Sequence, residues 1–141
     1  MNMKMKSSRI LLICPRYPHR WSVGMMLCRL GHQVFVARNL PEGVERTRAC
    51  QFDLVVLQDE LKGSPGSVTL RDFLDESTRR RTLVFTRESE PYPQCRRRYP
   101  EVREIMDFPE RPEELAAAVC EVLIMENYLG APQAVPEAQL H

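Results

Sequence analysis

One stretch, residues 52–60, limits the fold of this chain more than any other. It reads FDLVVLQDE: a polar approach, four apolar residues from Leu54 to Leu57, and an abrupt return to polar residues at Gln58. A short apolar run without alternation is typical of a strand buried on both faces of a parallel sheet. In open α/β sheets, ligands bind beyond the carboxyl ends of such strands. We therefore look for functional residues near Gln58 and at the ends of the other strands.

Further apolar stretches alternate with segments of helical spacing. Strands are predicted at 9–14, 33–37, 82–86 and 103–108 besides the central stretch. Helices are predicted from the apolar face Val23, Met26, Leu27 and Leu30, at 41–49, around Leu70, Phe73 and Leu74, and at 112–127, with loops at 15–18 and 62–66. Gly31 suits the left-handed end of the first helix, whereas Gly43 weakens the second.

Strands that alternate with helices in this way predict an α/β protein. Its architecture should be a three-layer α/β/α sandwich around a five-stranded parallel sheet, because each strand needs helices on both faces. The length of 141 residues favours the flavodoxin-like strand order 2-1-3-4-5 over a larger dinucleotide-binding sheet. We expect one domain at 8–128, with flexible ends at 1–7 and 130–141.

Composition excludes several classes of protein. The net charge of +1 says nothing for or against a nucleic-acid partner, and we expect none. The apolar runs are too short for a membrane span or a signal peptide, so we expect a cytoplasmic protein without a membrane partner. The five cysteines are scattered and include no Cys-x-x-Cys pair, which argues against disulfides and against a metal site.

Landmarks near the predicted strand ends share the spacing of a known family. They are Gln58 five residues after Asp53, Gly66 eight residues after Gln58, Thr86 at the end of the fourth strand, Phe108-Pro109 at the end of the fifth, and the helix start Pro112-Glu113-Glu114-Leu115. In this spacing, residues 9–127 resemble the receiver domain of bacterial two-component response regulators. The resemblance implies the same fold and a phosphoacceptor pocket at these strand ends.

The chemistry of that pocket is missing here. By position, Cys14 and Pro15 replace the family's magnesium-binding acids, Gln58 replaces its phosphorylated aspartate, Phe108 replaces its lysine, and Thr86 alone keeps the family's residue type. Phosphoryl transfer to a protein needs a nucleophilic carboxylate, a divalent cation and a positive group. We therefore predict a degenerate receiver domain, or pseudo-receiver, that is not an enzyme and uses no cofactor or metal.

Two neighbours of the pocket leave alternatives open. Asp59 follows Gln58, and a one-residue bulge would bring its carboxylate into the pocket, although such a shift turns a strand side chain to the other face. Cys14 lies at the mouth of the predicted pocket near Arg16, so that a redox-sensing thiol is an alternative to a small residue in place of an unneeded acid.

The predicted function is phosphorylation-independent protein–protein interaction in bacterial signalling or regulation. The resemblance implies a contact face at about 91–127, whose candidate residues are Arg96, Arg97, Arg98 and, at the family's aromatic switch position, Ile105. The partner is another protein or a second copy of the chain. In the first loop, Trp21 with its aromatic and arginine neighbours has the composition of a binding hot spot, with partial burial against the sheet as the alternative.

A second class of protein shares part of the pattern. The opening ILLICPRYP, followed by Gly31-His32-Gln33-Val34, also resembles the start of cobalamin-binding domains, which have the same type of sheet. The chain lacks the Asp-x-His-x-x-Gly loop of those domains, and it has no three-cysteine cluster for an iron–sulfur centre. Because of the similar opening, binding of cobalamin or another small ligand is kept as the alternative function. Because of the missing motifs, it ranks below the receiver-like function.

Overall fold

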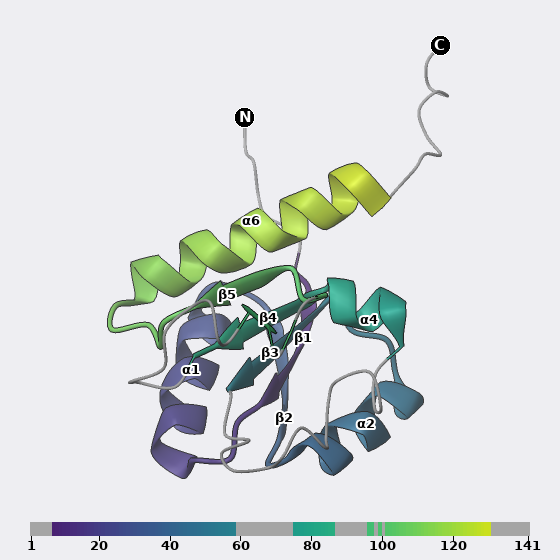
Figure 1. The fold of residues 1–141 in the computed structure, drawn as a ribbon. Helices are drawn as coiled ribbons and strands as arrows, with labels where there is room; N and C mark the ends of the chain where they lie inside the picture. The colour runs from purple at the N-terminus through teal and green to yellow at the C-terminus, as the bar shows by residue number, and fades with distance from the viewer. Residues whose placement is uncertain (1–6, 59–74, 87–95, 98, 100, 131–141) are drawn as a thin grey trace.

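The computed structural model describes residues 7–58, 75–86, 96–97, 99 and 101–130. Five strands form one parallel sheet in the order β2-β1-β3-β4-β5 (Figure 1). They are β1 (Arg9–Ile13), β2 (Gln33–Ala37), β3 (Leu54–Gln58), β4 (Thr82–Phe85) and β5 (Glu104–Met106). The predicted fold class, parallel pairing and strand order are confirmed.

Strand β3 is buried over its whole length, as its unbroken apolar run predicts. The edge strand β5 is shorter than the predicted stretch of residues 103–108. Phe108 leaves the ladder, and its ring meets the ring of Phe85 edge-on at a centroid distance of 5.4 Å. Pro109 follows and has no N–H group to donate to a ladder. The end of β5 is therefore decided by side-chain packing and a proline.

The described helices are α1 (Tyr17–Arg29), α2 (Leu40–Ala49), α4 (Glu76–Arg80) and α6 (Pro112–Gly130). Helix α1 begins inside the stretch predicted as a loop, because Pro18 fits the first turn of a helix. The side chain of Asn39 caps α2 by accepting the Glu42 N–H at 2.8 Å. Gly31 has a φ of 94° just after α1, so its predicted left-handed conformation is confirmed.

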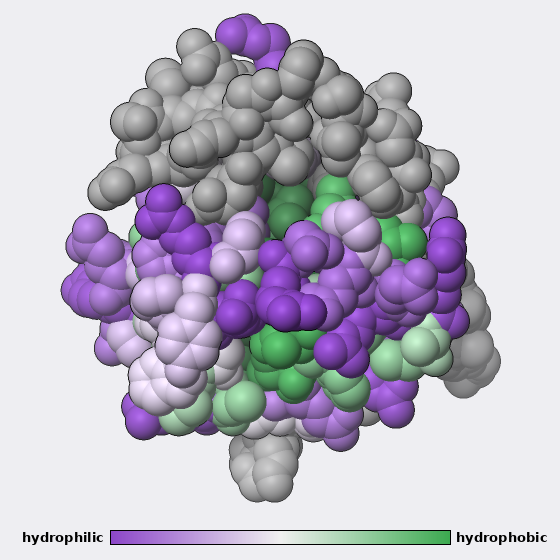
Figure 2. Space-filling model, turned by 90° about the horizontal axis from the view of Figure 1, so that it is seen from below, coloured by the Kyte–Doolittle hydropathy of each residue, from purple (hydrophilic) through white to green (hydrophobic). Residues whose placement is uncertain are grey.

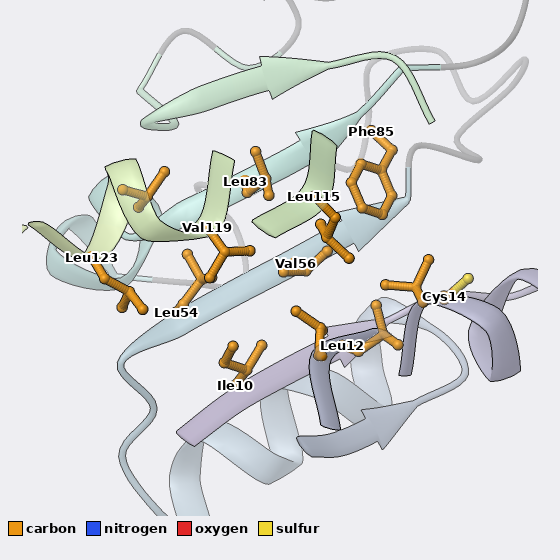
Figure 3. Packing of buried hydrophobic residues seen from close by; sticks show 13 residues of the cluster. Ile10, Leu12, Cys14, Leu54, Val56, Leu83, Phe85, Leu115, Val119 and Leu123 are labelled. Carbon is orange, nitrogen blue, oxygen red and sulfur yellow. The ribbon is translucent and has the colours of Figure 1, made fainter. Parts of the chain in front are cut away.

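Two apolar clusters fill the space on either side of the sheet. On one face, side chains of β1, β3 and β4 meet α1 and α6, with Leu115, Val119 and Leu123 of α6 pointing at the strands (Figure 3). On the other face, the sheet packs against Leu40 and Val44 of α2. The molecule is thus a three-layer sandwich in which α6 crosses over the sheet (Figure 1).

Two residues differ from their predicted roles in the helices. Leu30 was assigned to the buried face of the first helix but is 38% exposed, because it lies just beyond the end of α1. Gly43 lies close to β1: a Cβ atom added there would come within 2.5 Å of the Ile13 Cδ1 atom. This glycine therefore permits the close approach of α2 to the sheet.

Several predictions fall outside the described residues. These are the loop at 62–66, the helix marked by Leu70, Phe73 and Leu74, and the flexible ends at 1–6 and 131–141. Helix α6 includes Gly130, where the sequence predicts the start of the tail. In the described part of the chain, no helix is both long enough and apolar enough to cross a membrane.

Candidate functional site

The candidate site lies at the carboxyl edge of the sheet. Strands β1 and β3 pair with Ile13 opposite Leu57, so the next residues, Cys14 and Gln58, are neighbours at this edge. Gln58 in turn lies opposite Phe85, the last residue of β4. Viewed from below, the end at which α1 and α2 begin, the described surface is mostly polar with apolar residues near its centre (Figure 2).

Cys14 and Gln58 form a buried hydrogen-bonded pair. The Cys14 thiol donates to Gln58 Oε1 at 2.9 Å, and the two residues are 0% and 6% exposed. The thiol also lies 3.7 Å from the Arg16 carbonyl oxygen. A buried amide needs such partners, since an unpaired one would lose its hydrogen bonds with water. The sulfur and the amide thus satisfy one another where the resemblance implies acids.

His19 completes this cluster and is the residue that the sequence analysis missed. Gln58 Nε2 lies 2.7 Å from His19 Nδ1. Since Gln58 Oε1 accepts from the thiol, Gln58 Nε2 is the donor to His19 Nδ1. The His19 ring also stacks on Phe108, with ring centroids 4.3 Å apart and planes tilted by 31°.

A sequence signal for His19 did exist. Pro18 in the first turn of α1 places His19 one residue further along the same turn, beside the carboxyl edge of the sheet. Residues 15–18 are predicted as a loop, and that prediction assigns no role to His19. Placing the helix start at Tyr17 would have brought its ring next to the pocket.

Thr86 and Asp107 form a second polar pair at this edge. The Thr86 hydroxyl donates to Asp107 Oδ1 at 3.1 Å, and the Thr86 N–H donates to the Met106 carbonyl oxygen at 2.8 Å. Thr86 is buried, whereas Asp107 is exposed. The residue that keeps the family's type is therefore engaged by a carboxylate from the end of the neighbouring strand.

Pro15 is exposed, so it lies at the rim of the cluster. Its carbonyl oxygen and that of Cys14 accept hydrogen bonds from Arg20 Nη1 at 3.4 and 2.8 Å. Arg20 thereby holds the connection between β1 and α1 in place. Its guanidinium carbon also lies 5.7 Å from the centroid of the Tyr17 ring, within the range of a cation–π contact.

The arrangement offers little to a cation. Within the described residues, no group of three or more His, Cys, Asp or Glu side chains is placed to hold a metal ion. Asp59 and Gly66 lie outside those residues, so the alternative phosphoacceptor at Asp59 stays a prediction. Cys14, Gln58, His19 and Phe108 form a cluster that we call the plug. It places a thiol, an amide, an imidazole and an aromatic ring where the resemblance implies an acidic pocket.

The described residues of the predicted contact face are only partly exposed. Ile105 is 6% exposed and packs in the core, so it offers no surface to a partner. Arg96 is half-buried, and its Nη1 donates to the carbonyl oxygens of Tyr99 and Val102 at 3.1 and 3.0 Å. Arg97 is exposed, and the third predicted arginine, Arg98, lies outside the described residues.

A separate pocket of about 170 Å³ lies at the opposite, amino edge of the sheet. It is lined by Thr47, Cys50, Gln51, Phe52, Asp75, Thr78 and Arg81. Several of these residues precede β3 and β4, so the pocket is separated from Gln58 by the length of the strands. It gives no support to a ligand at the predicted site.

Comparison with known proteins establishes the type of fold. No family model and no curated protein sequence matches the chain. A response regulator receiver domain protein from Clostridium thermocellum superposes with a TM-score of 0.70 at 16% identity, covering 86% of this chain and 98% of that chain. The chain has a receiver-like fold.

Two further receiver-like neighbours agree. The chemotaxis protein CheY4 of Vibrio cholerae matches with a TM-score of 0.65 at 17% identity, over 83% of this chain and 99% of that one. The receiver domain of a sensor histidine kinase from Pseudomonas aeruginosa matches with a TM-score of 0.68 at 16% identity, over 84% and 98% of the two chains. That structure holds a magnesium ion in its active-site cleft.

Proposed function

We propose that this chain is a pseudo-receiver, which acts by binding another protein and accepts no phosphate. The observation that carries the proposal is Gln58 at the carboxyl end of β3, engaged by Cys14 on one side and by His19 on the other. The receiver-like fold supports a role in bacterial two-component signalling. The chemistry of the plug supports the proposed phosphorylation independence.

Three side chains of the plug lack properties that phosphoryl transfer requires. An amide at Gln58 is a poor nucleophile, and a thiol offers no hard oxygen ligand to magnesium. Phe108 carries no positive charge and is occupied by its stacking on His19. Magnesium binding and charge stabilisation therefore fail together with the missing nucleophile.

Catalysis by Cys14 is also disfavoured. Its side chain is fully buried, and its thiol proton points to an amide oxygen, which is not a base. His19 contacts the nitrogen side of the same amide and so does not reach the sulfur through this bond. The pair lacks the direct thiol–imidazole contact of a cysteine nucleophile. This supports a binding role and no enzymatic one.

Phosphate incorporation tests the proposal. The protein is incubated with acetyl phosphate and magnesium, and its intact mass is measured beside a receiver domain with a complete acidic pocket as positive control. We expect an adduct on the control and none on this chain. The variant Asp59→Asn serves as the matched comparison. A stoichiometric adduct on the wild type that disappears in this variant would overturn the proposal and assign Asp59 as the acceptor.

Partner capture tests the binding role. The tagged chain is used as bait in lysate of its source cells, with and without acetyl phosphate, and bound proteins are identified by mass spectrometry. We expect a signalling protein among them, in equal amounts under both conditions. Capture that depends on the phosphodonor would contradict a phosphorylation-independent role.

A further inference from the structure

Charge is distributed unevenly along the chain. Residues 1–41 contain seven Lys and Arg residues and no Asp or Glu. The remaining 100 residues contain thirteen Lys and Arg against nineteen Asp and Glu. The small net charge is therefore the sum of a basic segment, residues 1–41, and an acidic remainder. Such an asymmetry matters for association if the two signs reach the surface on separate elements.

Helix α1 carries two of these seven basic residues. They are Arg20 and Arg29, and the helix has no carboxylate. Tyr17 and Trp21, four residues apart and so on one side of the helix, are 65% and 60% exposed. Exposed Cys28 continues this stripe. Trp21 is the sole tryptophan of the chain, and large aromatic side chains beside arginine are typical of the centre of a binding interface.

Helix α6 displays the acidic part. Its sequence holds four glutamates and no lysine or arginine. Glu113, Ala117, Glu121 and Ile124 are exposed and follow one another at helical spacing, so they form a second stripe. Ile124 is 56% exposed, so this stripe carries a large aliphatic side chain beside its two glutamates.

The two stripes belong to one face of the molecule. Helices α1 and α6 cover the same face of the sheet and contact each other (Figure 1). Val23 and Leu27 of α1 are buried in the same cluster as Leu115 and Val119 of α6. Because the buried stripes face the sheet, the exposed stripes face away from it. A basic helix thus lies beside an acidic one, and both carry exposed apolar side chains.

We propose that this face binds a second copy of the chain in a two-fold symmetric dimer, with α1 of each copy against α6 of the other. A two-fold interface brings the same patch of both copies together, so the patch must complement itself. A face with adjacent positive and negative helices meets this condition, because a two-fold rotation sets each basic helix against an acidic one.

One charge on each of the two helices has no ion pair within the described part of one copy. Neither Arg29 nor Glu121 forms an ion pair with another described residue. The apolar contribution comes from Trp21, Tyr17 and Ile124 of both copies, which lose water on contact. The guanidinium of Arg20 over the Tyr17 ring restrains this ring before binding, which reduces the entropy lost on association.

This inference rests on the proposed binding role, for which it gives a second copy of the chain as one partner. The test of the dimer is independent of the phosphate test. Phosphate incorporation would overturn the proposed function and leave the dimer unaffected. A monomeric protein would overturn the dimer and leave the pseudo-receiver unaffected.

Light scattering coupled to size-exclusion chromatography measures the mass of the full chain in reducing buffer, so that Cys28 forms no disulfide. We expect a dimer at low salt and a larger monomer fraction at high salt, because salt screens exposed charges. Trp21→Ala should be monomeric under both conditions with a nearly unchanged melting temperature, as expected for an exposed residue. A monomeric wild type at its highest soluble concentration, or a Trp21→Ala dimer as strong as the wild type, would overturn the proposal.

Charge reversal tests the reciprocal geometry. One variant carries Arg29→Glu on α1, and a second carries Glu121→Lys on α6. Each variant alone places like charges against each other and should be monomeric. An equimolar mixture should form a heterodimer, because each reversed helix then meets a helix of opposite charge.

The matched control for charge reversal is Arg48→Glu on α2, a position whose side chain is 74% exposed on the other face of the sheet. This variant should dimerise like the wild type. Two monomeric charge variants that stay monomeric when mixed would contradict the two-fold arrangement. Loss of the dimer in Arg48→Glu would show that net charge, and not the α1–α6 face, controls association.

Discussion

At Gln58 a single side-chain amide contacts both a buried thiol and a half-buried imidazole. Its oxygen accepts from Cys14 and its nitrogen contacts His19. Gln58→Leu keeps the approximate size of the side chain but leaves the imidazole nitrogen without its donor. We expect a loss of about 1–3 kcal/mol in the free energy of unfolding, measured by urea titration. The exposed Gln33 on β2 is the control: Gln33→Leu should change stability by less than about 0.5 kcal/mol.

His32 is a second buried polar residue, at the amino edge of the sheet. It is 7% exposed, and its Nδ1 accepts the Ser8 N–H at 3.3 Å. Burial lowers the pKa of His32 below its usual value of 6.5, while the nearby Asp53 carboxylate opposes this shift. The folded state therefore binds this proton less readily than the unfolded state. The resulting contribution to stability is complete above pH 6.5 and declines as the pH falls below it.

A pair of urea titrations measures this effect. The midpoint of the wild type should fall between about pH 7.5 and about pH 5.5, the range in which histidine changes charge. His32→Gln keeps a side-chain acceptor without a titrating group, and its midpoint should fall less. Equal pH dependence of the two proteins would mean that His32 is not protonated on unfolding. Carboxylates with lowered pKa values, such as Glu42 and Asp75, act only at lower pH.

At the scale of elements, the contact between α2 and β1 changes the expected effect of a glycine-to-alanine substitution. Helix propensity alone predicts that alanine at position 43 stabilises the protein. Alanine is favoured over glycine inside a helix by about 1 kcal/mol. At Gly43, however, the new methyl group would lie 2.5 Å from Ile13 Cδ1 and 2.9 Å from Ile13 Cγ1. We expect Gly43→Ala to lower the free energy of unfolding by about 1–3 kcal/mol, the usual effect of overpacking a core.

Two further variants test this explanation by thermal melting. Gly24→Ala on α1 meets only Leu12 Cδ2 at 3.9 Å and should raise the melting temperature. Adding Ile13→Val to Gly43→Ala removes the Cδ1 atom and should recover part of the loss. A stabilising Gly43→Ala variant would show that α2 moves away from the sheet at little cost.

The segment before β5 contains Arg96, which was predicted to face a partner but contacts the chain itself. Arg96 bridges the carbonyl oxygens of Tyr99 and Val102, both of which are buried residues. Removal of a charged donor from buried acceptors costs about 1.5–3 kcal/mol, so Arg96→Ala should lower the urea midpoint clearly. Arg97→Ala, its exposed neighbour, should leave the midpoint unchanged. Equal effects of the two substitutions would contradict the bridging role.

At the scale of the whole molecule, two apolar clusters enclose the sheet and bury the site cysteine. Cys14 belongs to the cluster beneath α1 and α6, whereas Cys28 is exposed on α1. In dilute protein, a thiol reagent should label Cys28 in the native state and Cys14 only as fast as the whole molecule unfolds. Residue-resolved mass spectrometry across a urea series measures both rates. Native-state labelling of Cys14 would show a local opening at the carboxyl edge and revive the redox alternative.

The sequence by itself determined the layers and the strand order. Five short apolar runs separated by helical segments allow few arrangements, because each strand must bury both faces and each crossover is right-handed. The presence of Cys14, Pro15 and Gln58 where the resemblance implies acids was equally visible, since it depends only on which residues end the strands.

Tertiary structure alone decided how those strand ends meet the helices. His19 contacts Gln58, which is 39 residues away in the sequence. Gly43 leaves room for the Ile13 side chain, and Ile105 is buried in the core. Periodicity shows which side of an element is apolar. It does not show how far apart two elements lie, or which of their side chains face each other. Those contacts depend on close packing of residues that are distant in the sequence, and they appear only when the layers are assembled.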